Sequence, residues 1–256
     1  MVHRDLAGIR DAAALTKLPA EEQEACRTFW AEVEAVRKKA QAAIPRTVAH
    51  FRFNGNAKDK SKGNAQFELT NTEFKENALY LNGIYEQSFQ KNAYRAVCKT
   101  PKLNYASFTV ALKFKAIDFA PGKSNLITGG IARQFGMHRS QAGNLTVTLN
   151  NQEISYEIKS ATLVKGKWTV VACGFDLPSR KVIVYLEGKK VAEIDLPKDF
   201  RLQAVKLGVT KEAPVWSFAD YGDGNAFHGL VEELIIYERL LSADEFGKIP
   251  LVGGNR

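Results

Sequence analysis

The chain has 256 residues, of which 45% are hydrophobic and 25% are charged, a composition typical of a globular protein and not of a fibrous or disordered one. No apolar run approaches the ~20 residues that a membrane-spanning helix needs. The formal net charge is +8, and since residues 1–45 hold seven basic and seven acidic side chains, all of the excess lies in residues 46–256. A body with this charge is expected to attract polyanions.

The first residues, MVHRDLAGIRDAAAL, carry charges where a secretory signal would have its apolar stretch. Two interpretations stay open: the protein remains inside the cell, or the chain begins after a removed segment. The three cysteines, Cys26, Cys98 and Cys173, lie far apart without CxxC spacing. This spacing argues against a disulfide framework or a zinc site and indicates small buried hydrophobic residues.

Residues 1–45 are predicted to form a helical arm. Pro19 suits a first helical position, and residues 20–44 run without glycine or proline. One face of this helix is apolar at three-and-four spacing: Cys26, Phe29, Trp30, Val33, Val36 and Ala40. That face either packs on the following domain or binds a partner, which includes self-association of two chains through residues 20–43.

Residues 46–256 are rich in predicted strands of five to nine residues, among them SFTVALKFK, LTVTLNN, EISYEIK, WTVVACGF and KVIVYLE. Turn clusters such as APGKSN and LPSR separate them, and no helix intervenes. A parallel α/β fold would need crossover helices. The expected fold is all-β, an antiparallel sandwich or jelly roll with an N-terminal α-helical arm and a short C-terminal helix at SADEFGKI.

Four landmarks in chain order make this body recognisable: FRFNGNAKDKSKGN with ALYLNG, then SFTVALKFKA, then GKWTVVACGFDLPSRKVIVYLEGKKVAE, and last FHGLVEELIIYERLLSADEF. Over about residues 47–249 the sequence resembles the laminin-G-like jelly roll, a branch of the concanavalin A-like lectin and glucanase fold. The resemblance implies a concave face and a loop-rich rim where members bind sugars, proteins or calcium. It also favours an extracellular or cell-surface location.

Three positions in the body have structural interpretations. Trp168 begins a strand and shares a face with Val170 and Ala172, so we interpret it as a core residue, with sugar stacking as the alternative. Gly188 lies at a hairpin turn that is expected to need a positive φ. Asp59 is expected to cap its own turn, with metal ligation as the alternative.

The glutamates of VEELIIYE raise the question of glycosidase activity, since relatives in this wider fold are retaining glucanases. A nucleophile and an acid/base must lie roughly 5 Å apart, which alternate positions on one strand face provide. Here Glu232 and Glu233 point to opposite faces, and Glu238 lies about 20 Å from Glu232 along the strand. We therefore expect a structural strand whose glutamates lie at an edge, a turn or a salt bridge, and a protein that is not an enzyme.

The segment EAPVWSFADYGDGNAFHG offers oxygen ligands and rings in one polar stretch. Asp220, Asp223 and Asn225 could hold calcium in a flexible loop, although glycines replace two EF-hand ligands, and a solvated turn is the alternative. The rings of Trp216 and Tyr221 either stack on sugars or close one end of the sandwich. No other cofactor is predicted.

Basic side chains gather near two turns, with Arg133, His138 and Arg139 around one and Lys58, Lys60 and Lys62 in the first long loop. These side chains could hold a sulfated or carboxylated polysaccharide through salt-sensitive contacts. Nucleic acid is not expected, because no nucleic-acid-binding motif accompanies the charge.

The sequence thus predicts a non-catalytic, lectin-like adhesion module that binds carbohydrate or an extracellular protein through its rim loops, within a larger extracellular assembly of bacterial type. Two alternatives remain open: an assembly module that associates through the N-terminal helix, and a glycoside hydrolase of the glucanase branch.

Overall fold

The computed structural model describes residues 15–42, 47–83, 94–100, 103, 105–120, 122–130, 134–150, 152–202, 215–219 and 227–249. Contacts divide the chain into two compact units, Met1–Pro45 and Arg46–Arg256. None of the helices in these ranges combines the length and apolar character that crossing a membrane requires.

In the first unit, helix α2 spans Ala20–Ala42, as predicted, with Glu21 and Glu22 in its first turn. Carboxylates at this end interact favourably with the helix dipole. Two side chains of the predicted apolar face are open to solvent: Phe29 is 50% exposed and Val33 is 36% exposed. Phe29 also meets the ring of Trp30 edge-on, with 5.2 Å between the ring centroids.

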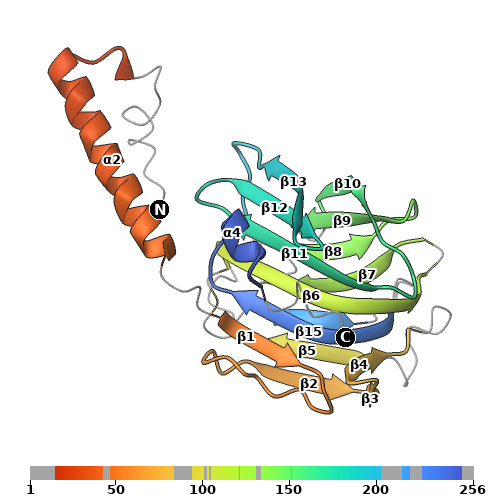
Figure 1. Cartoon of the computed structure of the whole chain (residues 1–256). Coiled ribbons are helices and arrows are strands. Elements are labelled where there is room, and N and C mark those ends of the chain that lie inside the picture. The colour runs from red at the N-terminus through yellow and green to blue at the C-terminus, as the bar shows by residue number, and fades with distance from the viewer. Residues whose placement is uncertain are drawn as a thin grey trace. The chain divides into compact units, whose positions relative to one another are not determined.

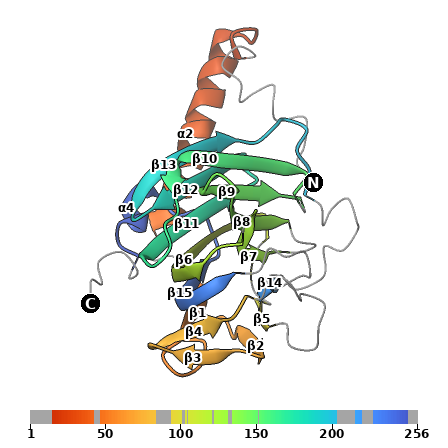
Figure 2. The ribbon, with the colours of Figure 1, turned by 90° about the vertical axis from the view of Figure 1, so that its right-hand side faces the viewer.

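The second unit is the predicted antiparallel sandwich of two sheets (Figure 1). Sheet A contains, in spatial order, β13 (Lys189–Asp195), β12 (Lys181–Leu186), β11 (Trp168–Asp176), β6 (Ser107–Asp118), β15 (His228–Tyr237), β4 (Ala78–Leu81) and β3 (Glu73–Lys75), with β1 (Thr47–Arg52) also paired to β15. Sheet B contains β10 (Ile154–Thr162), β9 (Asn144–Leu149), β8 (Phe135–Arg139), β7 (Ser124–Gly129), β14 (Val215–Ala219), β5 (Arg95–Lys99) and β2 (Gln66–Thr70). Figure 2 shows the two sheets as separate layers.

The core lies between the sheets and is built on aromatic rings from both. Phe108 of β6 meets Phe135 of β8 and Trp216 of β14, at centroid distances of 5.4 and 5.1 Å. Nearer β1, Phe51 packs on Phe67 of β2 at 4.9 Å. Burying each such ring contributes about 1.5–3 kcal/mol to the free energy of unfolding, so these contacts hold the two sheets face to face.

A short helix, α4 (Ala243–Phe246), lies on the outer side of sheet A. Its Phe246 stacks on Tyr185 with 3.5 Å between centroids. A second buried cluster forms here, separate from the core between the sheets: Ala111, Val170, Ala172, Tyr185, Ile235, Tyr237, Leu241, Phe246 and Ile249. Strands β6, β11 and β15 are therefore buried on both faces over part of their length.

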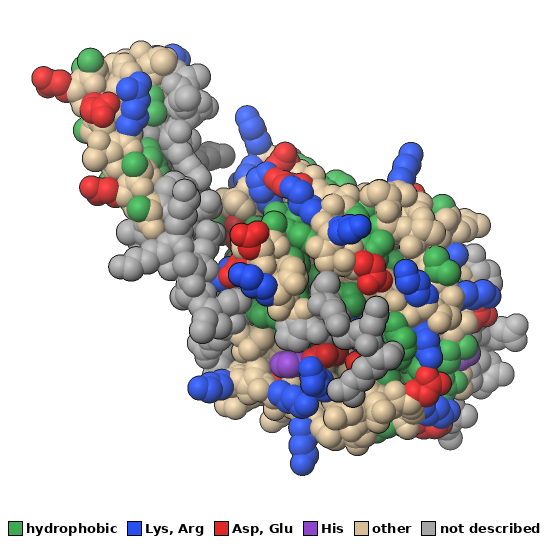
Figure 3. All heavy atoms as spheres, in the orientation of Figure 1, with side chains coloured by type: hydrophobic (Ala, Val, Ile, Leu, Met, Phe, Trp, Pro, Cys, Tyr) green, Lys and Arg blue, Asp and Glu red, His purple; other side chains and the backbone are tan. Residues whose placement is uncertain are grey.

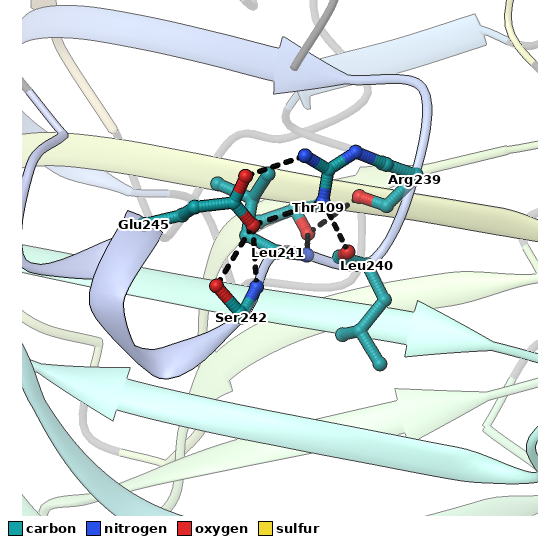
Figure 4. Close-up of polar contacts among 6 residues, drawn as sticks. All are labelled: Thr109, Arg239, Leu240, Leu241, Ser242 and Glu245. Carbon is teal, nitrogen blue, oxygen red and sulfur yellow. Dashed lines mark hydrogen bonds and ion pairs between the residues drawn. The ribbon is translucent and has the colours of Figure 1, made fainter. Parts of the chain in front are cut away.

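Figure 4 shows the polar contacts that fasten the connection between β15 and α4. The guanidinium of Arg239 donates two hydrogen bonds to the carboxylate of Glu245, at 2.9 and 2.5 Å. Glu245 also accepts hydrogen bonds from the backbone N–H and the hydroxyl of Ser242, the residue that caps α4. Thr109 of β6 donates to the carbonyl of Arg239 and accepts from the N–H of Leu241.

Two turn predictions are confirmed. Gly188 has φ 76°, in the left-handed region that favours glycine. Asp59 accepts hydrogen bonds from the backbone N–H groups of His50, Ser61 and Ala65 and from the Ser61 hydroxyl, so it caps its loop as expected.

The cysteines are free thiols, of which Cys98 and Cys173 are buried, as predicted, whereas Cys26 is only partly buried.

Candidate functional site

The outward face of sheet B is unusual because most of its buried side chains are polar. Along β8, β9 and β14, hydrophobic residues turn inward to the core and the residues between them turn outward. The buried polar side chains of the outward set, which we call the polar face, are Asn125, Thr128, His138, Thr146, Thr148 and Ser217. Cross-strand pairing joins Ser217 to Thr128 and His138 to both Asn125 and Thr146.

His138 organises the centre of the polar face. Its Nδ1 lies 2.7 Å from the side-chain oxygen of Asn125, and its Nε2 lies 2.7 Å from the hydroxyl of Thr148. Burial, assisted by the charge of Lys123, lowers the pKa of His138 to about 3. The imidazole is therefore neutral at pH 7, and it donates to Asn125 and accepts from Thr148. Gly136 leaves the room for this contact, since a Cβ there would lie 2.5 Å from Nε2 of His138.

Two hydroxyl groups of the polar face have unused hydrogen-bonding capacity. Thr146 Oγ1 and Ser217 Oγ are buried, and neither has a partner among the described residues. A buried hydroxyl without a partner costs about 1–3 kcal/mol. Waters, or a ligand that displaces what covers these two hydroxyls, can supply the missing hydrogen bonds.

The structure corrects the interpretation of Trp216 as a sugar-stacking ring. β14 lies inside sheet B, between β7 and β5, and Trp216 turns inward, where it is fully buried. Its indole N–H donates to the Thr100 hydroxyl at 3.2 Å. The ring closes the core and offers no surface to a ligand.

Two of the predicted basic side chains are also committed to internal contacts. His138 is buried and neutral, which corrects its proposed role as a basic group for an acidic polymer. Arg139 ends β8, and its guanidinium lies 4.6 Å from the ring centroid of Phe119. Its Nε is buried without a hydrogen-bond partner in the described part of the chain.

The other predicted site residues, Arg133, Asp220, Tyr221, Asp223 and Asn225, lie outside the described residues. Within the described ranges, no group of three or more His, Cys, Asp or Glu side chains is placed to hold a metal ion.

Of the three places expected for the glutamates of β15, an edge, a turn or a salt bridge, the structure shows salt bridges for Glu232 and Glu233, on a strand inside sheet A. Glu232 pairs with Lys113 at 3.0 Å. Glu233 accepts from Arg52 at 2.9 Å and lies 2.5 Å from Nε2 of His50. Burial opposes the charge of Glu233, but the hydrogen bonds from His50 and Arg52 outweigh it and lower the pKa of this carboxyl.

Trp168 is not part of the core, which corrects its interpretation. It lies on the outward face of sheet A and is partly exposed. The ammonium groups of Lys115 and Lys113 lie 5.2 and 5.8 Å from its ring centroid, distances within the range of cation–π attraction.

Comparison with known proteins assigns the family. The laminin-G model described as concanavalin A-like lectin/glucanases superfamily matches residues 89–246. The chain belongs to this superfamily. No curated protein sequence matches the chain.

Solved structures share the lectin/glucanase fold at low sequence identity. Botulinum neurotoxin type C, whose cell entry is dependent upon interaction with two ganglioside molecules, superimposes with a TM-score of 0.61 and 10% identity over 79% of this chain and 50% of that one. Domain 4 of AbnA, an extracellular arabinanase from Geobacillus stearothermophilus in complex with arabinotriose, superimposes with a TM-score of 0.55 and 17% identity over 81% of this chain and 98% of that one. Trypanosoma rangeli sialidase superimposes with a TM-score of 0.57 and 13% identity over 91% of this chain and 40% of that one. The chain spans about half the length of the neurotoxin chains.

Within this superfamily fold, the polar face was missed by sequence reasoning. Its signal is present in LTVTLNN, where threonines alternate with aliphatic residues. Alternation alone indicates a half-buried strand. It does not distinguish a solvated outer face from one that is buried and polar.

Proposed function

We propose that residues 46–256 form a non-catalytic carbohydrate-binding module whose ligand contacts the polar face of sheet B. The observation that carries this proposal is the pair of buried hydroxyls, Thr146 and Ser217, that lack partners among the described residues. Sugar hydroxyls both donate and accept hydrogen bonds, so they complement a surface of hydroxyl, amide and imidazole groups.

The relatives in fold support the class of ligand. Domain 4 of AbnA is in complex with arabinotriose, cell entry of botulinum neurotoxin type C is dependent upon interaction with two ganglioside molecules, and the binding domain of botulinum neurotoxin DC is in complex with SialylT. The polar face itself favours a neutral sugar, because its six side chains carry no charge at pH 7 and His138 is neutral there.

A glycan array, run with the whole chain and with a Thr146→Val/Ser217→Ala double variant, tests this proposal. The unchanged chain is expected to bind at least one neutral glycan. The double variant is expected to bind it at least about tenfold more weakly, because two hydrogen bonds to the sugar are lost. Ser179→Ala is the matched control, since the Ser179 hydroxyl is also buried without a described partner but lies in the turn between β11 and β12.

The same array separates the remaining rim predictions. Binding that is lost with a chelator would assign the ligand to calcium held by Asp220, Asp223 and Asn225. Binding that is lost only at raised salt would assign an acidic polysaccharide to the basic surface, with Arg133 as a candidate and Tyr221 as a stacking ring. Absence of binding under all conditions would contradict the proposal.

The non-catalytic part of the proposal rests on the ion pairs of β15. Glu232 and Glu233 each contact a basic side chain, and burial of Glu233 leaves it 3% exposed. A hydrolase needs two carboxyl groups that reach one glycosidic bond. We therefore expect no release of reducing sugar from any glycan that the chain binds, and release that disappears in a Glu232→Gln or Glu233→Gln variant would overturn this part.

A second candidate function, assembly through α2, is favoured by the exposure of Phe29 and Val33. Apolar side chains of this size at one helix face are suited to pairing with another helix. If α2 assembles two chains, the mass measured by sedimentation rises with concentration for residues 1–256 and stays constant for residues 46–256. Phe29→Ser should weaken the association, and Thr28→Ser, at an exposed neighbouring position, should not.

A further inference from the structure

A row of four side chains crosses the outward face of sheet A, on the side opposite to the polar face. Strand register places Tyr80 of β4 beside Leu230 of β15, Leu230 beside Lys115 of β6, and Lys115 beside Trp168 of β11. Cross-strand partners lie on the same face of a sheet. These residues, which we call the aromatic row, therefore run across four strands, and three strand spacings separate the two rings by ~14 Å.

The ends of the aromatic row are aromatic, and its middle holds Leu230 and Lys115. Leu230 is 1% exposed, so its side chain is buried between the two rings. Tyr80 and Trp168 are both partly exposed. The hydroxyl of Tyr80 also lies 3.3 Å from Nε2 of His228.

Charged groups surround both rings, and they are balanced. Lys75 lies 3.8 Å from the ring centroid of Tyr80 and pairs with Glu73 at 2.9 Å. Beside Trp168, Lys115 pairs with Glu76 at 2.7 Å, and Lys113 pairs with Glu232. Each ammonium group near a ring thus has a carboxylate within contact distance. Figure 3, which looks onto this side of the second unit, shows basic, acidic and hydrophobic side chains interspersed.

This balance discriminates between ligand classes. A polyanion would meet as many carboxylates as ammonium groups, so its attraction to the row would largely cancel. A neutral sugar chain loses nothing from this cancellation. Its apolar ring faces suit Trp168 and Tyr80, and its hydroxyls can accept from the lysines and donate to the glutamates.

We propose that the aromatic row binds a neutral oligosaccharide laid across β4, β15, β6 and β11, with Trp168 as the main stacking ring. The ligand class follows the proposed function, but the site is a second one on the opposite sheet. The distance between the rings leaves room for more than one sugar unit, so a hexasaccharide should bind more tightly than a monosaccharide of the same sugar.

Tryptophan fluorescence tests this site directly. The chain has three tryptophans, and in a Trp30→Phe background only Trp168 and the fully buried Trp216 remain. Acrylamide quenching in that background therefore reports on Trp168. We expect at least one of cellohexaose, xylohexaose and mannohexaose to lower the quenching constant roughly twofold or more, because a sugar stacked on the ring excludes the quencher.

Calorimetry with the same hexasaccharide provides the affinities. Trp168→Ala should weaken binding at least about tenfold, which is ~1.4 kcal/mol, and Tyr80→Ala should weaken it less. Phe74→Ala is the matched control, since Phe74 is an exposed ring on β3 that pairs with Leu79 outside the row. Raising the salt from about 0.05 to about 0.5 M should change the affinity less than roughly twofold.

The proposal is overturned if no neutral hexasaccharide protects Trp168, if Trp168→Ala and Phe74→Ala have equal effects, or if only a heparin hexasaccharide protects the ring and salt removes the protection. The Thr146→Val/Ser217→Ala variant separates this proposal from the one for the polar face. Protection of Trp168 should persist in that variant. If the double variant leaves all sugar binding intact while Trp168→Ala abolishes it, the polar face fails and the aromatic row stands.

Discussion

At the scale of single residues, Glu245 shows how a surface carboxylate becomes structural. Its pKa is lowered to about 2: burial opposes the charge, but hydrogen bonds from Arg239 and from the backbone and hydroxyl of Ser242 outweigh burial. Each of these contacts is stronger with the ionised carboxylate than with the protonated carboxyl group. The connection from β15 to α4 therefore depends on Glu245 remaining charged.

This dependence predicts a loss of stability in acid. Because the folded pKa lies below the ordinary value of 4.5, Glu245 stabilises the fold above about pH 4.5, and this contribution is lost as the pH falls toward 2. Glu245→Gln should lower the free energy of unfolding at pH 7 by about 1–3 kcal/mol. Urea titrations at pH 7, 4 and 3 should show a smaller difference between the variant and the unchanged chain at each lower pH.

Asp244→Asn, at an exposed neighbouring position in α4, is the control for that series. Equal stability losses in both variants, or a difference that does not shrink in acid, would show that the Glu245 contacts do not stabilise the fold.

Residue chemistry alone could not place the two tryptophans of the body. Trp216 stands in a polar segment and is core, whereas Trp168 stands among apolar residues and is partly exposed. Val170 and Ala172 share the outward face of β11 with Trp168, and they are buried because they form one cluster with Phe246 of α4. Apolar residues occur on both faces of that strand, so alternation cannot show which face is the interior of the sandwich.

At the scale of elements, the position of Trp216 in β14 depends on how closely its ring approaches the backbone of β7. A Cβ at Gly129 would lie 2.2 Å from the indole of Trp216, so glycine is required where β7 passes the ring. Gly129→Ala should displace Trp216 and lower the free energy of unfolding by about 1–3 kcal/mol. Urea unfolding gives the loss, and near-ultraviolet circular dichroism should show a weaker tryptophan signal.

Gly122→Ala is the matched control, since a Cβ there meets nothing within 4 Å. The assignment of Gly129 would be contradicted by two variants of equal stability and equal tryptophan signal.

Element patterns predicted most of the architecture. Strand length, turn composition and the lack of predicted helices between the strands correctly indicated an antiparallel sandwich, and serine before an acidic segment correctly placed α4. The sequence left an edge, a turn and a salt bridge open for the β15 glutamates, and the structure decides for salt bridges, since β15 lies between β6 and the strands β4 and β1. Strand order is a property of tertiary pairing, which local periodicity does not contain.

At the scale of the whole molecule, the second unit presents two different outward faces. The polar face of sheet B is uncharged, buried and hydrogen-bonded around His138. The outward face of sheet A carries paired charges and two partly exposed rings. The excess positive charge of the chain thus lies outside both candidate sites. Net charge predicted a polyanionic ligand because it is a sum over the whole chain and does not show where the charges lie.

The measurement that tests the carbohydrate-binding account most directly is a two-dimensional NMR titration of the whole nitrogen-15-labelled chain with the neutral glycan that binds best on the array. We predict saturable shifts of the amides of β7, β8, β9 and β14 around His138, Thr146 and Ser217. Shifts confined to α2, or no shifts in sheet B at saturating glycan, would contradict the proposal that the polar face binds sugar.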